Sequence, residues 1–566
     1  MAQDRNETSR RAFLGTTGLA GSLCLLGRAN AATERAENGP RDVGAVRTRP
    51  NIKSLDPAGP EIVSLRKGVA VMMQRDVDSQ PGSDPTGWLF QAAMHGVNAP
   101  YYYWNQCQHG TWWFFPWHRL YVYYFERILR KASGDDKLML PYWGWDDLND
   151  ASQQAIPVAF RFPADPNANS LYDPSRNTAL NDPSNPATLP DFDPSYALGL
   201  DNFIGPYPNG FGGQQIGPLS SPQDGHDVRP HGGLEYYPHD LIHNSVSGNM
   251  GSPATAALDP IFWLHHANID RLWKIWHRRN PAVHLDPTDN SDWMNQTFLF
   301  YDETGTLVNP QVAVKDVLDT EKDLGYRYED DPRNEDRAEP VVQRPRRRPS
   351  DRKEMVPMND HAQADAAFGA IVAATDAPAG AAFGADPIRV ALALPDDAGA
   401  AVDQLARSLF DPKAGSPTFT LIIEGIKFEV DPGAPYGIYL NLPAADARPC
   451  NTDVHFAGAL AFFGLYTHPM PAGKLDKNAP PPPIPDRLKG GSRGGGGDYA
   501  LDVTRTVLAL KGLNLWNSKS LSVTLIRHDP IDHAFREPKP DAPAPRATFQ
   551  RISLRIKRTP EAERVK

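Results

Sequence analysis

The sequence predicts two folded domains: a mainly α-helical domain with long loops, followed by an all-β domain of the sandwich or jelly-roll type. Apolar residues recur at helical spacing up to about residue 331, and they follow the period of strands from about residue 388 onward. Between these regions the chain is charged and rich in proline. With 566 residues the chain is also too long for one ordinary core. We therefore place the helical domain at residues 41–331, a linker at 332–360 and the β domain at 361–558.

The N-terminal residues 1–31 are predicted to be an export signal. Thr8 to Leu14 reads TSRRAFL, a twin-arginine pattern, and an apolar run follows from Phe13 to Leu26. That run is too short to span a bilayer, and Ala29-Asn30-Ala31 fits a cleavage site. We therefore expect export by the twin-arginine pathway to the periplasm or out of the cell, with no stable membrane insertion after cleavage.

The net charge, the cysteine count and the proline and glycine content limit the kinds of protein that this chain can be. The formal net charge of -10 argues against a nucleic-acid partner. Three cysteines, Cys24, Cys107 and Cys450, are too few and too far apart for a disulfide framework. The 55 prolines and 45 glycines indicate much loop-supported structure.

Helical periodicity and capping residues locate the elements of the first domain. Pro116 precedes one helix, and Asp259-Pro260 begins another. Residues 163–230, rich in Asp, Asn, Pro and Gly, are expected to form irregular surface that shapes the rim of a pocket. The predicted helices cover residues 61–75, 87–95, 117–131, 235–243 and 261–278.

The residues after Tyr328 are expected to be an exposed linker and a protease target. Residues 329–353 mix acids, prolines and a basic run, which favours a solvated segment over nucleic-acid contact. Short apolar runs between turn residues then indicate strands, with the runs 480–483 and 494–497 in one flexible loop. The predicted strands cover residues 388–394, 419–425, 427–430, 437–442, 454–463, 500–510, 521–527 and 547–556.

Two groups of histidines are the main functional signal. His95 ends a predicted helix, His109 lies in an aromatic loop and His118 begins a second helix, so the three can converge on one ion. In the second group, His239 and His243 project from the same helical face because they are four residues apart. The pair His265 and His266 follows on the next predicted helix.

The donor set favours copper. Structural zinc usually recruits cysteine, and hydrolytic zinc or non-haem iron usually takes a carboxylate, whereas these groups offer imidazole alone. Three histidines leave positions open on each ion for an outside ligand. Two neighbouring coppers can bind O2 and together accept the two electrons lost when a catechol becomes a quinone.

Two stretches resemble the copper A and copper B signatures of type-3 copper proteins, the family of tyrosinases, catechol oxidases and molluscan-type haemocyanins. Residues 109–126 read HGTWWFFPWHRLYVYYFE, and residues 259–270 read DPIFWLHHANID. The resemblance implies that His265 is a packing residue and not a ligand. It implies that copper A is bound by His95, His109 and His118, and copper B by His239, His243 and His266.

The resemblance also suggests roles around the two coppers. Cys107 is expected to form a thioether with His109, the alternative being a buried cysteine. Glu235 matches a glutamate that holds a water and so orients a base toward an incoming phenol. Asp240 stands where members that hydroxylate monophenols often carry Asn, and Asn244 is a candidate to share that role. Pro253 replaces a bulky aromatic gate over copper A, which predicts an open pocket.

Other residues near these motifs have simpler interpretations. Asp270, one turn after His266, is a candidate acceptor for that ring, the alternative being a surface or Arg271-paired carboxylate. His226, His231, His277 and His468 fall outside both signatures and are interpreted as ordinary histidines.

The regions beyond the histidines also resemble known parts of the family. Residues 319–328 resemble the tyrosine motif that closes the catalytic domain of plant and fungal members. Residues 427–430 and 456–458 resemble the C-terminal domain of plant polyphenol oxidases, which caps the active site of a latent proenzyme. We expect a residue from the loop at 442–454 to block the entrance.

The resulting hypothesis is an exported tyrosinase or polyphenol oxidase with two copper ions and O2 as co-substrate. It predicts oxidation of o-diphenols to o-quinones, o-hydroxylation of monophenols, and latency until a protease removes the C-terminal domain. Expected partners are small phenols, an activating protease and a copper chaperone. One alternative is a haemocyanin-like reversible O2 carrier, although carriers are large multi-unit assemblies. The other, a zinc hydrolase, lacks a ligating carboxylate.

Overall fold

The computed structural model describes most of residues 45–331 and 369–557. The predicted export signal, the linker at 332–360, His226, His468 and most of the loop at 442–454 therefore lie outside the described residues. Within the described part of the chain, no helix combines the length and apolar character needed to cross a membrane. Inside the two ranges the gaps are residues 98–100, 191, 206–208, 226–230, 379–380, 409–416, 429–433, 444–453, 464–477, 479–494, 518, 529–530, 533–536 and 539–546.

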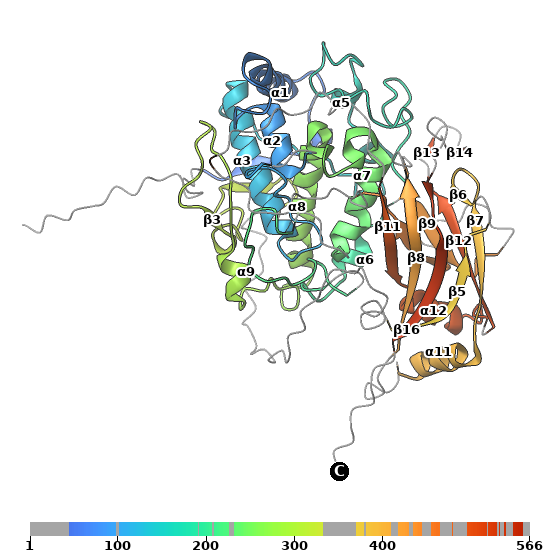
Figure 1. Cartoon of the computed structure of the whole chain (residues 1–566). Helices are drawn as coiled ribbons and strands as arrows, with labels where there is room; N and C mark the ends of the chain where they lie inside the picture. Colours follow the sequence, from blue (N-terminus) through green and yellow to red (C-terminus); the bar gives the residue numbers. More distant parts are fainter. Residues whose placement is uncertain are drawn as a thin grey trace, which may run out of the picture. The chain divides into compact units, whose positions relative to one another are not determined.

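The first domain is helical, as predicted (Figure 1). Its main helices match the predicted ranges to within a few residues: α1 (Pro60–Asp78), α2 (Trp88–His95), α3 (Phe114–Ser133) and α8 (Ile261–Arg279). The predicted helix at 235–243 is instead divided into η2 (Glu235–His239) and α7 (Asp240–Val246), and Tyr237 inside η2 has extended backbone angles.

Short elements complete this domain. The brief helices are η1 (Ile52–Ser54), α4 (Ala151–Gln154), α5 (Val158–Arg161), α6 (Ser195–Leu198), η3 (Gly248–Gly251), η4 (Ala256–Leu258), α9 (Ser291–Asn295) and η5 (Val314–Asp316). The strands are β1 (Arg47–Arg49), which pairs in parallel with β4 (Tyr326–Tyr328), and β2 (Thr297–Phe298), which pairs with β3 (Val312–Ala313).

The core of the helical domain is aromatic. Phe125 of α3 stacks on Trp263 of α8 with ring centroids 3.4 Å apart and planes at 6°. On the other side, α1 approaches α3 closely at Gly68, where a Cβ atom would lie 2.7 Å from Leu129. Stacked aromatic pairs add to the free energy of burial, so α3 is held firmly between its neighbours. This matters because α3 carries His118 and α8 carries His266, one predicted ligand from each signature.

The start of α2 depends on a buried carboxylate. The Leu89 amide in the first turn of α2 donates to Oδ2 of Asp76 on α1, at 2.8 Å. Burial raises the pKa of Asp76 to about 6. The carboxyl group of Asp76 therefore binds its proton more tightly in the folded protein than in the unfolded chain. Its protonated form contributes fully to the free energy of unfolding below about pH 4, and this contribution is lost as the pH rises from about 4 to 6.

We expect Asp76→Asn to stabilise the protein at pH 7. The amide oxygen can still accept from Leu89, while the cost of burying a charge disappears, so the gain is about 1 to 2 kcal/mol. Thermal unfolding should show a higher Tm for the variant at pH 7 and a difference that shrinks toward pH 4. A gain that is the same at both pH values would contradict the explanation from charge burial.

The C-terminal domain is β-rich (Figure 1). In addition to the short antiparallel pair β13 (Ile531–Asp532) and β14 (Glu537–Pro538), its described residues form two larger antiparallel sheets. One has the strand order β10-β9-β12-β7, and the other has the order β5-β16-β8-β15-β6 with β11 added on β8. Leu392 and Val523 from the first sheet and Leu421 and Leu554 from the second belong to one buried apolar cluster. The predicted fold class is thus confirmed.

Several local predictions in this domain were wrong. The segment at 419–425 and residues 427–428 of the next predicted segment form one strand, β8, which passes through Gly425 at φ +64°, while 429–430 lie outside the described residues. The strand predicted at 500–510 is the end of β11 followed by a helix, α12. A further helix, α11, was not predicted, although Ala398, Ala401, Val402 and Leu405 are buried at helical spacing.

The remaining bounds of the C-terminal domain are as follows. The helices are α11 (Asp396–Ser408) and α12 (Thr504–Gly512). The strands are β5 (Ala370–Asp376), β6 (Ala382–Phe383), β7 (Ile388–Ala393), β8 (Thr418–Phe428), β9 (Tyr436–Leu440), β10 (Phe456–Leu460), β11 (Gly495–Asp502), β12 (Ser520–Arg527), β13 (Ile531–Asp532), β14 (Glu537–Pro538), β15 (Ala547–Thr548) and β16 (Arg551–Lys557).

Candidate metal centre

The first histidine group converges from three elements. His95 is the last residue of α2, His109 lies in the loop before α3, and His118 lies in α3. Their ring centroids are 5.2 Å apart for His95 and His109, 5.7 Å for His95 and His118, and 5.5 Å for His109 and His118. All three rings are buried. The sequence prediction that separate elements bring these three residues together is confirmed.

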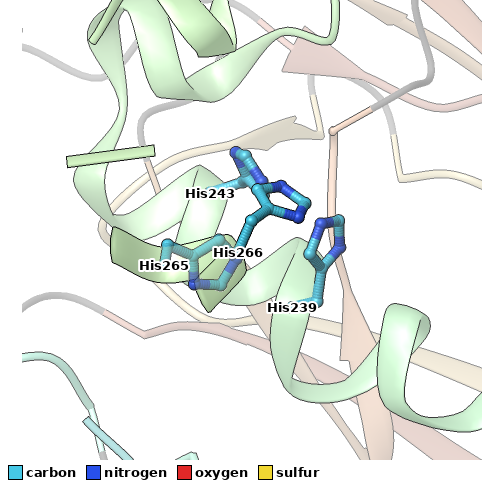
Figure 2. Close-up of side chains that lie close together, drawn as sticks. All are labelled: His239, His243, His265 and His266. Carbon is cyan, nitrogen blue, oxygen red and sulfur yellow. The ribbon is translucent and has the colours of Figure 1, made fainter. Parts of the chain in front are cut away.

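The second group comes from α7, the residue before it, and α8. The ring centroids are 4.6 Å apart for His239 and His243, 5.1 Å for His239 and His266, and 5.6 Å for His243 and His266. Figure 2 shows these side chains gathered together with His265. The two groups adjoin, because His118 and His266 stack with centroids 4.4 Å apart and planes at 9°. The six predicted ligands thus form one cluster of two neighbouring triplets.

Hydrogen bonds fix the tautomers of several rings. Nδ1 of His95 contacts the Pro253 carbonyl oxygen at 2.8 Å. Nδ1 of His118 contacts the Phe114 carbonyl oxygen, and Nδ1 of His243 that of Met250, both at 2.8 Å. A carbonyl oxygen only accepts, so in each ring Nδ1 carries the proton and the Nε2 lone pair remains for a metal.

His265 and His266 differ in this respect. A candidate ligand atom of His265 lies within 4.8 Å of those of His239, His243 and His266, so distance alone admits it. However, Nε1 of Trp145 donates to Nδ1 of His265 at 3.1 Å. The neutral ring therefore carries its proton on Nε2 and has no lone pair to offer. In His266, by contrast, neither ring nitrogen has a hydrogen-bond partner among the described residues. This agrees with the interpretation of His265 as a packing residue.

The electrostatics favour neutral imidazoles. Burial lowers the pKa of His109, His118, His243 and His266 well below the ordinary value, and neighbouring imidazoles lower it further. Neutral rings are the metal-binding form of histidine. Neither triplet includes a carboxylate, so the donor set fits copper better than a hydrolytic zinc or iron site.

The loop that carries His109 is held on both sides of that residue. Sγ of Cys107 lies 3.3 Å from Nδ1 of His109. The next amide, that of Gly110, donates to both carboxylate oxygens of Glu235 at 2.9 and 2.8 Å. Burial raises the pKa of Glu235 to about 8. The predicted thioether pair is therefore in contact, and Glu235 contacts the backbone of the loop.

The other predicted residues lie at or near the centre with different contacts. Oδ1 of Asp240 accepts from Nδ1 of His239 at 3.0 Å. Oδ1 of Asn244 accepts from the backbone amides of Phe462 and Phe463 at 2.8 and 3.1 Å. Pro253, the predicted gate, contacts His95 through its carbonyl oxygen.

Two predictions about nearby residues were wrong. Asp270 does not orient His266 and does not pair with Arg271. It accepts from Nε of Arg119 and the Tyr326 hydroxyl at 2.5 Å and from the Tyr328 hydroxyl at 2.6 Å, so it ties α3, α8 and β4 together. His231 is not an ordinary histidine, because its ring stacks on His109 with centroids 6.0 Å apart and planes at 25°.

Sequence reasoning also missed Phe463. Its ring stacks on His243 with centroids 4.0 Å apart and planes at 21°. It also meets His109 and His239 edge-on at 5.7 and 5.6 Å. Phe463 comes after the loop at 442–454 in which a blocking residue was expected. Nothing in its local sequence distinguishes it from Phe462 beside it, which packs into the β-domain core.

Comparison with known proteins agrees with these observations. The family model of the common central domain of tyrosinase matches residues 85–209 and 208–279, and that of the polyphenol oxidase middle domain matches residues 286–340. The chain is 30% identical over 504 residues to a tyrosinase of Hahella sp. (strain CCB-MM4), covering 81% of this chain and 91% of the relative. It is 36% identical over 293 residues to polyphenol oxidase A1 of Vicia faba, covering 47% of this chain and 45% of that protein. The chain thus matches about half the length of this plant relative.

Solved structures extend the likeness to the fold of nearly the whole chain. A latent aurone synthase (polyphenol oxidase) has a TM-score of 0.51 at 21% identity, covering 92% of this chain and 91% of that one. Latent apple tyrosinase has a TM-score of 0.51 at 23% identity, covering 91% and 97%. Both likenesses extend over the helical domain and the β-rich domain.

Proposed function

The chain belongs to the tyrosinase and polyphenol oxidase family of type-3 copper oxidoreductases, and on this premise we propose that it oxidises o-diphenols to o-quinones and also o-hydroxylates monophenols. The observation that carries this proposal is the pair of adjoining histidine triplets. His95, His118 and His243 offer Nε2 lone pairs, because their Nδ1 atoms donate to carbonyl oxygens. When bound, two copper ions would bind O2 and take up the two electrons of the diphenol.

We propose that the six clustered histidines bind two copper ions and that one of them is cross-linked to a cysteine. Copper A is bound by His95, His109 and His118, and copper B by His239, His243 and His266. Cys107 forms a thioether with His109, which is supported by the contact of 3.3 Å between Sγ and Nδ1. Such a bond would limit rotation of the one ligand that lies on a loop.

Glu235 is proposed to help remove the phenol proton. Phenols have an ordinary pKa near 10 and bind metal poorly until deprotonated. Burial raises the pKa of Glu235 above that of an exposed carboxyl group, which makes its carboxylate a better proton acceptor for a phenol reached through a water. Asp240 and Asn244 are proposed to influence how far the enzyme acts on monophenols.

We expect Glu235→Gln to lower kcat/KM for a monophenol by about 100-fold, because general-base assistance is lost. The o-diphenol is more acidic and should lose less. Steady-state rates with a monophenol and its matching o-diphenol measure the difference. Copper content determined by metal analysis serves as the control and should stay unchanged. Equal losses with both substrates would contradict a role in deprotonation.

Latency is proposed to come from Phe463. Its ring lies against His243, and the adjacent backbone is held by Asn244. A substrate phenol would need to approach the same histidines. We therefore propose that the C-terminal domain keeps the enzyme inactive until a protease cuts the linker at 332–360.

Export and maturation complete the proposal. The twin-arginine pattern at residues 8–14 supports export of the folded, copper-loaded protein to the periplasm or out of the cell. A copper chaperone would supply the metal before export. The relatives compared above are tyrosinases and polyphenol oxidases, so a haemocyanin-like oxygen carrier is not favoured.

Oxygen consumption tests the proposed function. Purified, copper-loaded protein is assayed with a monophenol and an o-diphenol before and after limited proteolysis. Consumption of O2 with the o-diphenol, rising after cleavage, supports the oxidase and its latency. Reversible binding of O2 with no phenol consumed after cleavage would favour the carrier instead.

A further inference from the structure

His231 lies outside both copper signatures yet contacts the centre from two directions. It is only 2% exposed. Its Nδ1 lies 2.8 Å from Oδ2 of Asp240. The face of its ring stacks on His109, one of the proposed ligands of copper A. Its Nδ1 also lies 3.6 Å from Oε1 of Glu235, which is longer than the distance to Asp240.

The contact with Asp240 continues to copper B. The carboxylate of Asp240 accepts from two imidazoles, since Oδ1 is 3.0 Å from Nδ1 of His239 and Oδ2 is 2.8 Å from Nδ1 of His231. A carboxylate only accepts, so both Nδ1 atoms carry their protons. In His239 this leaves Nε2 as the atom that faces a metal. The three side chains therefore form a histidine–aspartate–histidine chain that ends at copper B.

The Asp240 carboxylate needs its second partner. Asp240 is only 2% exposed, so water does not readily replace a lost donor at Oδ2. A buried carboxylate oxygen without a donor is costly, and the side chain would rotate to find another one. Rotation would take Oδ1 away from His239 and release that ring from its metal-binding orientation. Carboxylates that accept from ligating histidines fix the tautomer and orientation of those rings.

We propose that His231 is a positioning residue of the metal centre, which holds Asp240 in the orientation that presents His239 to copper B. Its stacking on His109 adds a contact with the copper A side. The inference rests on the proposed copper centre. It explains why a buried histidine outside the signatures occupies this position.

Three substitutions of His231 distinguish the effect of its hydrogen bond to Asp240 from the effect of its stacking on His109. His231→Asn places an amide N–H where Nδ1 stood and so keeps the donor to Asp240. His231→Phe keeps an aromatic face for His109 and removes the donor. His231→Ala removes both. Copper affinity of the full-length protein is measured by competition with a chromophoric copper chelator.

We expect His231→Ala and His231→Phe to lower copper affinity by about 10- to 100-fold, the range found for partners of metal-ligating histidines. His231→Asn should retain affinity close to that of the unsubstituted protein. Unchanged affinity in the alanine variant would overturn the proposal. So would rescue by phenylalanine and not by asparagine, because the role would then be packing.

A matched control is His284→Asn. His284 is also buried and stacks on an aromatic ring, that of Trp276, at 4.7 Å and 2°. Its loss should lower Tm without changing copper affinity. If the unsubstituted protein binds no copper, the proposed function fails. If it binds two coppers and the alanine variant binds them equally well, only this inference fails. Should the alanine variant not fold, the asparagine and phenylalanine variants still decide.

Discussion

His266→Asn is expected to abolish phenol oxidation, whereas His265→Asn leaves copper binding intact. The two histidines are adjacent on α8, and both rings are buried beside His239 and His243. They differ in their hydrogen bonds: His265 accepts from Trp145, and His266 has no partner among the described residues. We expect loss of His266 to lower kcat by about 1,000-fold or more, equivalent to about 4 kcal/mol.

The asparagine at position 265 is chosen because its amide oxygen can still accept from the Trp145 indole. This avoids leaving a buried donor without a partner, which would lower stability by about 1 to 3 kcal/mol. Metal analysis should find two coppers per chain in His265→Asn and one in His266→Asn. If the copper content fell in His265→Asn and remained at two in His266→Asn, the ligand assignment would be reversed.

Most of the histidine cluster was predictable, because regular elements place most of its members. His239 and His243 are four residues apart, and His266 has a fixed place in α8, so helical geometry carries the sequence spacing directly into space. The lone His109 in its loop was harder to place, and its position depends on Gly110 and Glu235, which are far apart in the sequence. Periodicity contains no information about such a contact.

The wrong predictions for Asp270 and His231 have the same cause: sequence spacing does not show which distant residues a side chain contacts. Asp270 has the correct spacing to reach His266, yet Arg119, Tyr326 and Tyr328 take both of its oxygens. A buried carboxylate takes charged and hydroxyl donors first, because these offset its desolvation best. His231 lies outside both signatures along the chain, so the spacing of the signatures does not indicate its contact with Asp240. The role proposed for it rests on Asp240, which contacts both His231 and His239.

The helices α11 and α12 show a different limitation. Helical spacing was present in α11, but the surrounding strands favoured the expectation of an all-β domain. In α12, residues 504–510 alternate closely enough to resemble a strand, yet Val507 and Leu510 are buried three residues apart. Whether a short amphipathic segment of this kind forms a helix or a strand depends on how it packs against its neighbours, and the local sequence pattern does not decide it.

Phe463→Ala is expected to activate the full-length enzyme without proteolysis. The phenyl ring stacks on His243 and meets His109 and His239, which are the histidines a substrate would approach. Removing the ring leaves space beside both proposed copper sites, while Asn244 can still accept from the backbone of the same segment. We expect kcat/KM for an o-diphenol to rise by about 10-fold or more. The substrate no longer has to displace the phenyl ring, and each 1.4 kcal/mol of that free-energy cost corresponds to a factor of ten.

The variant Phe462→Leu is the control that distinguishes removal of the ring over the histidines from destabilisation of the C-terminal domain. Phe462 packs against Phe383 and Phe428 in the β-domain core, so this substitution should lower Tm and leave the latent rate unchanged. Phe463→Ala should do the reverse, raising the rate with little change in Tm. If both variants were activated equally, release of the whole domain would explain latency, and the contact between Phe463 and His243 would be a consequence of docking. Activation by Phe463→Ala alone makes that single ring the barrier between phenol and metal.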